Sequence, residues 1–262
     1  GFSFVGLGSI AAFGMLAVAG LSGGAGGGAG GGLPSAVGAL IKGSMAAGPA
    51  LANTDLWVKA YGADGTELAT ARLNDDGTYE FRLPAGYIGP VLLRIVDANG
   101  DLPDYIDETS GEAKDLTADL RSVIFATGED GTYTANINPA TELMVRKLGL
   151  KGGDQGASEI SPNGLTADQI AAANTEVAEA LGLPGTDLVA DTPKLAVDEE
   201  GNPNPDADDY GNILAAISGS ESQTEQTTDK VLDDLEKDIG SDGVLSDEGK
   251  AALLAGATAA DV

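Results

Sequence analysis

The chain has 262 residues, of which 41 are acidic and 14 basic, and its formal net charge is −27. It has no cysteine and no histidine, which excludes disulfides, thiolate metal sites and His-dependent catalytic triads. So acidic a chain repels nucleic acid, because nucleic acid is bound through Lys and Arg. Composition therefore argues against nucleic acid as a partner and against the commonest classes of hydrolase.

The charges are distributed unevenly along the sequence. No residue before Lys42 is charged, whereas all 41 acidic residues lie from Asp55 onward. An apolar, glycine-rich head thus precedes a heavily acidic body. This arrangement is typical of a protein that is held at one end and projects into water.

Residues 1–21 are predicted to form an apolar helix that acts as an anchor or as an assembly element. The segment carries no charge and has roughly the length that a helix needs to cross a bilayer. It lacks a basic flank and an initiating Met, so we interpret the sequence as processed or excerpted. Insertion in lipid and packing within a protein assembly both fit. The apolar side chains available for either contact are Phe2, Phe4, Val5, Leu7, Ile10, Phe13, Met15, Leu16, Val18 and Leu21.

A glycine-rich tether and a β-domain are expected next. Residues 22–32 read SGGAGGGAGGG, a composition typical of a flexible linker. Residues 33–138 predict an Ig-like antiparallel β-sandwich, because apolar residues alternate in runs such as the one with Leu56 and Val58. Turn dipeptides such as Asp64-Gly65 separate these runs, as tight hairpins require. Trp57 is expected in the core.

Residues 139–262 predict a small α-helical domain with acidic loops, which places the chain in the α+β class. Pro139 suits the first turn of a helix, and Thr166 forms a capping-box pair with Gln169. Amphipathic stretches occur at 139–148, 168–183, 211–218, 229–239 and 246–254. Polar loops are expected at 151–164, 198–209 and 219–228.

An acidic segment carries the most ligand-like pattern of the sequence. Oxygen donors occupy four positions of the twelve-residue calcium-loop pattern, namely Asp97, Asn99, Asp101 and Glu108. Leu102 stands where that pattern has glycine, and no predicted helices flank the segment. The remaining alternatives are a calcium site between β-strand loops and a plain acidic surface loop. The candidate Ca²⁺ donors are Asp97, Asn99, Asp101, Asp104, Asp107 and Glu108.

The other acidic stretches offer little catalytic chemistry. A second carboxylate cluster fits either a cation site or a solvated loop, and consists of Asp198, Glu199, Glu200, Asp206, Asp208 and Asp209. The sequence has no G-x-S-x-G motif and no phosphate-binding loop. We therefore expect no enzyme, no catalytic residues and no cofactor other than Ca²⁺.

Three motifs resemble segments of large bacterial biofilm-associated surface adhesins with Ig-like or transthyretin-like modules. They are VKAYGADG at 58–65, VDANGDLPDYIDE at 96–108 and NINPATEL at 136–143. The resemblance implies an extracellular, non-enzymatic protein at the bacterial cell surface, in which β-modules serve as spacers or adhesive units and are often rigidified by calcium. The present chain is far shorter than such adhesins and lacks tandem repeats.

Two functions of different classes follow from these features. The first is an anchored structural or adhesive surface protein whose acidic body projects outward. The second is a self-assembling subunit of an extracellular filament or pilus-like fibre, in which residues 1–21 pack between copies. The expected partners are other copies or modules of a surface assembly, with a membrane contact through residues 1–21 in the anchored case.

Overall fold

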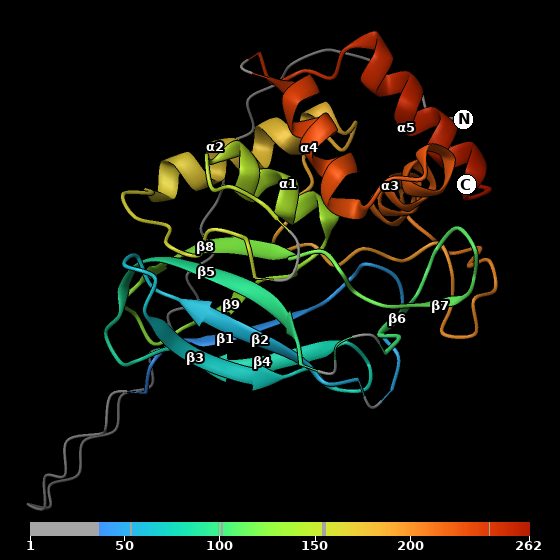
Figure 1. The fold of residues 1–262 in the computed structure, drawn as a ribbon. Helices are drawn as coiled ribbons and strands as arrows, with labels where there is room; N and C mark the ends of the chain where they lie inside the picture. The colour runs from blue at the N-terminus through green and yellow to red at the C-terminus, as the bar shows by residue number, and fades with distance from the viewer. Residues whose placement is uncertain (1–36, 53, 99, 101, 154–155, 241) are drawn as a thin grey trace, which may run out of the picture. The chain divides into compact units, whose positions relative to one another are not determined.

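The computed structural model describes residues 37–262 except 53, 99, 101, 154, 155 and 241. The helix predicted at 1–21 and the tether at 22–32 lie outside the described residues. Residues Ala36–Val262 group into one compact unit, whose described residues are drawn in colour in Figure 1. Its described part contains β-strands followed by five helices, so the α+β class is confirmed.

The strands of the described residues form three sheets. A three-stranded sheet has the order β4-β1-β9, a four-stranded sheet has the order β3-β2-β5-β8, and β6 and β7 form a hairpin. Their pairs are antiparallel except for β1 and β9, which are parallel. The strands are β1 Leu40–Ser44, β2 Leu56–Tyr61, β3 Glu67–Arg72, β4 Thr78–Arg82, β5 Ile88–Asp97, β6 Tyr105–Ile106, β7 Ala113–Lys114, β8 Arg121–Thr127 and β9 Thr132–Thr134.

Local sequence signals set the turns between the first strands. Gly65 and Gly77 have φ values of +78° and +74°, the left-handed region that glycine enters without steric cost. The preceding Asp64 and Asp76 each accept a hydrogen bond from the amide two residues further on, at 3.0 Å. The predicted Asp-Gly turns thus connect β2 to β3 and β3 to β4.

Polar capping residues begin the helices, and among them the Thr166–Gln169 capping pair of α2 was predicted from the sequence. Asn138 and Thr166 each form a capping box, with Pro139 in the first turn of α1. A capping residue satisfies amides at the helix start that have no partner within the helix. The helices are α1 Pro139–Lys147, α2 Ala167–Ala180, α3 Asp209–Thr224, α4 Thr228–Ile239 and α5 Asp247–Ala259.

Strands and helices share one hydrophobic core. The core cluster runs from Ile41 and Leu56 in the sheets to Leu143 in α1 and Leu232 in α4. Helix α1 contacts β8 and also α2, α3 and α4, and Figure 1 shows the helices gathered on the β8 side of the strands. None of the helices in the described part of the chain combines the length and apolarity required for a membrane crossing.

Two details differ from the sequence-based expectation. Trp57 lies on the half-buried face of β2 instead of in the core, and its Nε1 donates to Asp55 Oδ1 at 3.0 Å. The stretch 219–224, expected as a loop, continues α3 to Thr224. This segment remains helical because it packs against α5, where Gly219 lies against the backbone of Gly256. Glycine allows this close approach because it has no side chain.

Candidate functional site

The β6–β7 hairpin brings three carboxylates together at one end of the four-stranded sheet. Asp97 ends β5, Asp104 precedes β6 and Asp115 follows β7. One carboxylate oxygen of each lies within 4.8 Å of the other two. Asp104 is completely buried, and its Oδ2 accepts a hydrogen bond from Leu116 N at 3.1 Å. Such a group of carboxylate oxygens has the chemistry that a hard cation such as Ca²⁺ requires.

Two of these three carboxylates were among the predicted calcium donors, and Asp115 was missed. It lies outside the 97–108 pattern and reaches Asp104 only through the hairpin, where Asp104 N donates to Lys114 O at 2.8 Å. The signal that could have found it was the short Tyr105–Ile106 run opposite Ala113–Lys114. Asn99 and Asp101 lie outside the described residues.

The predicted donors Asp107 and Glu108 do not belong to this carboxylate cluster. Asp107 accepts hydrogen bonds from Ser110 N at 2.8 Å and from Ser218 Oγ of α3 at 2.9 Å. Burial alone would raise the pKa of Asp107, but the hydrogen bonds from Ser110 and the charge of Lys114 lower it overall. Asp107 is therefore an anion that holds the hairpin turn and α3.

Glu108 is buried at the tip of the same hairpin. Its Oε1 accepts a hydrogen bond from Ala196 N at 3.1 Å, and no described residue donates a hydrogen bond to its Oε2. Burial raises the pKa of Glu108 to about 8, and the nearby charge of Asp107 contributes in the same direction. The raised pKa favours the protonated, uncharged form of this carboxyl group.

A buried ion-pair network connects the strands to the helices. Arg121 of β8 binds both carboxylate oxygens of Glu142 in α1, at 2.9 and 2.7 Å. Arg146, one turn further along α1, contacts Glu142 Oε1 at 2.8 Å and continues to Asp229 and Asp233 of α4. Since every carboxylate here faces a guanidinium, the network is suited to holding elements together and offers no free acid or base.

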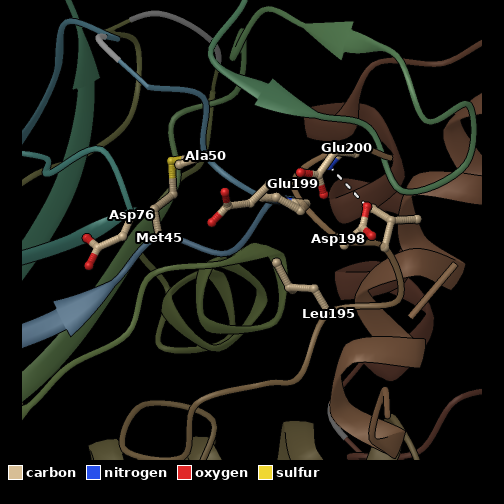
Figure 2. A pocket seen from close by; sticks show the side chains of 9 residues that line it. Met45, Ala50, Asp76, Leu195, Asp198, Glu199 and Glu200 are labelled. Carbon is tan, nitrogen blue, oxygen red and sulfur yellow. Dashed lines mark hydrogen bonds between the residues drawn. The ribbon is translucent and has the colours of Figure 1, made fainter. Parts of the chain in front are cut away.

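The described surface also has an acidic pocket of about 440 Å³. Figure 2 shows Asp76 and Met45 on one side, Asp198 and Glu200 on the other, and the Glu199 side chain between them. Apolar residues including Leu195 form the rest of the lining. The pocket can accommodate a cationic group with an apolar stem and disfavours anions.

The residues of the second predicted carboxylate cluster lie in different places. Asp198, Glu199 and Glu200 line this pocket, whereas Asp208 caps a helix. Asp198 accepts hydrogen bonds from Glu200 N at 3.0 Å and Asn202 N at 2.8 Å, so it closes its own turn. These hydrogen bonds lower the pKa of Asp198, with those from Asn202 contributing most. Asp208 caps α3 through Gly211 N at 2.8 Å. The six carboxylates do not gather around one point in the described structure.

Comparison with known proteins adds no relative from which a function could be transferred. No protein-family model matches the chain, and no curated protein matches it. The similarity of three motifs to bacterial surface adhesins therefore stays an interpretation of the sequence.

Proposed function

We propose that the protein is a non-enzymatic structural or adhesive component of a bacterial cell surface, held through its apolar residues 1–21. The observation that carries this proposal is that sheets and helices share one core and are joined by the buried Arg121–Glu142–Arg146 network. An acidic body built in this way is a rigid unit suited to projecting from a surface.

The connection between the head and the body supports the same proposal. The uncharged stretch of the sequence extends through Ile41, which is a fully buried residue of β1. Strand β1 is hydrogen-bonded to β4 on one side and to β9 on the other. A force applied to the head would pass directly into the middle of a sheet, which is what an anchored spacer requires.

We also propose the finer architecture that the motifs suggest. The three-stranded and four-stranded sheets would form the two layers of an Ig-like β-sandwich, since Ile41 and Tyr79 of one sheet and Leu56 and Val58 of the other belong to one core cluster. Ca²⁺ would bind at Asp97, Asp104 and Asp115 and would stiffen the end of the four-stranded sheet that carries the β6–β7 hairpin.

The second candidate is a self-assembling subunit of an extracellular filament. It is favoured by the same continuity between the head and β1. If the head packs against neighbouring copies, force along the filament would be transmitted to each body through the sheet that contains β1. In this case residues 1–21 would contact protein instead of lipid, and intact chains would polymerise without any membrane.

The experiment that tests the proposal is electron microscopy of the intact chain beside a variant lacking residues 1–32, both without lipid. Dispersed particles, or clumps that detergent dissolves, are expected for the anchored protein, and the truncated chain should be a folded monomer. If the intact chain forms regular fibres and the truncated chain does not, the protein is a filament subunit and the proposal of an anchored surface protein is wrong. Hydrolysis of a polysaccharide that is lost on carboxylate substitution would contradict both.

A further inference from the structure

The tip of the β6–β7 hairpin lies against the segment that leads into α3. Gly111 at the tip and Gly201 in that segment approach so closely that a Cβ atom on Gly201 would lie 2.5 Å from Gly111 O. Both glycines have positive φ, +67° and +79°. The hydrogen bond from Ala196 N to Glu108 Oε1 is a second contact between the same two segments.

The other side of the hairpin is tied to α3. Ser218 Oγ lies 2.9 Å from Asp107 Oδ2 and 3.1 Å from Thr109 Oγ1. Lys114 of β7 forms ion pairs with Glu221 of α3 at 2.9 Å and with Asp107 at 3.3 Å. The hairpin thus joins the 195–203 segment to α3.

Glu108 lies between these contacts with 2% of its surface exposed. Asp107 on the same turn is the charged group that acts on Glu108, and Asp107 in turn pairs with Lys114 of β7, which also pairs with Glu221 of α3. The 195–203 segment presents the Ala196 amide to Glu108 and carries Asp198, Glu199 and Glu200. Lys114 is already shared by two carboxylates. An ionised Glu108 would therefore be a buried anion beside another anion, with one hydrogen bond to offset the lost hydration.

We propose that the β6–β7 hairpin is a pH-dependent clasp, which holds the 195–203 segment while Glu108 is protonated and loosens when Glu108 ionises. The direction follows from linkage. Because the pKa of Glu108 is raised to about 8 in the folded protein, its contribution is fully present below the ordinary carboxyl pKa. This contribution declines as the pH rises towards 8, where the folded form also loses the proton.

Hydrogen exchange of the full chain at pH 6 and pH 9, in the presence of a chelator, tests the clasp. After correction for the intrinsic exchange rate, amides in 105–114 and 195–203 should lose about tenfold or more in protection between the two pH values. Glu108→Gln should remove this dependence, because its side chain does not titrate. Glu112→Gln, an exposed position on the same hairpin, is the matched control and should behave as the parent protein.

A second measurement keeps the proposal testable if Glu108→Gln weakens the hairpin at every pH. In a carbon-13 NMR titration of the parent protein, the side-chain carboxyl of Glu108 should titrate well above the ordinary carboxyl range, near pH 8. The clasp is refuted if Glu108 titrates in the ordinary carboxyl range. It is equally refuted if the parent and Glu108→Gln lose the same protection between pH 6 and pH 9.

Discussion

The guanidinium of Arg121 lies in the interior with no exposed surface, and the carboxylate of Glu142 beside it is equally buried. Replacing Arg121 by Met leaves Glu142 with Arg146 alone and removes the hydrogen bonds from Arg121 to the carbonyl oxygens of Glu159 and Leu150. We expect a loss of about 3–5 kcal/mol in the free energy of unfolding. Urea unfolding followed by circular dichroism measures this change.

An exposed arginine provides the control for that experiment. Arg72 pairs with Asp55 at 3.5 Å, and both side chains are about half exposed. Since solvent-exposed ion pairs contribute about 0–1 kcal/mol, Arg72→Met should change the unfolding free energy little. Equal losses for Arg72→Met and Arg121→Met would show that the buried network does not connect the strands to the helices energetically.

The carboxylate of Asp104 tests the proposed calcium site. If Ca²⁺ binds there, adding it at about a hundred times its dissociation constant should raise the unfolding free energy by about 2.7 kcal/mol. Asp104→Asn should abolish the Ca²⁺-dependent rise in melting temperature, while its amide oxygen can still accept from Leu116 N. Asp198→Asn, in the acidic pocket, should leave the rise intact. A rise that survives Asp104→Asn places the ion elsewhere.

The sequence could predict single residues where their partners are close along the chain. Asp64, Asp76 and Asn138 bond to amides two or three residues away, so their roles follow from local patterns. Asp115 meets Asp97 only through the register of the β6–β7 hairpin, so the short Tyr105–Ile106 run was the sole local hint of this contact among the described residues. Arg121 likewise meets Glu142 across 21 positions, and no periodicity indicates this pair.

Helices α3 and α5 cross at two glycines, and this contact yields a prediction for whole elements. A Cβ atom on Gly219 would lie 2.0 Å from the carbonyl oxygen of Gly256, so Gly219→Ala has to push the helices apart. We expect a loss of about 1–3 kcal/mol in the free energy of unfolding, although Ala favours a helix more than Gly does. Thermal unfolding monitored by calorimetry gives the difference.

The control is a glycine that has free space around it. Nothing lies within 4 Å of a Cβ atom built on Gly131, and its φ is not in the positive range that L-residues avoid. Gly131→Ala should be neutral or slightly stabilising, since it lowers the entropy of the unfolded chain. A neutral Gly219→Ala would contradict the close crossing.

At the scale of elements, the sequence predicts where most helices begin and less well where they end. Caps at Asn138 and Thr166 and the apolar spacing of α4 are local signals. The end of α3 is different, because Ser220 donates to Ala216 O within its own helix and to Ala252 O of α5. The composition of 219–224 predicts a loop, but tertiary contacts with α5 keep this segment helical.

At the scale of the whole molecule, charge is separated along the chain. Each copy carries a formal net charge of −27, and all of its acidic residues follow the uncharged head. Copies that approach one another therefore repel through their bodies and can attract through their heads. Repulsion between charged bodies is screened by salt, whereas contact between apolar segments is not.

Association of the intact chain should therefore increase with ionic strength. At 10 mM NaCl the screening length is about 30 Å, and near 1 M it is about 3 Å, so high salt lets the bodies come close enough for the heads to meet. Sedimentation velocity at both concentrations should show larger species for the intact chain at high salt. The chain without residues 1–32 should stay monomeric at both. Association that weakens with salt would indicate contacts through ion pairs of the acidic body, and the head would lose its assigned role.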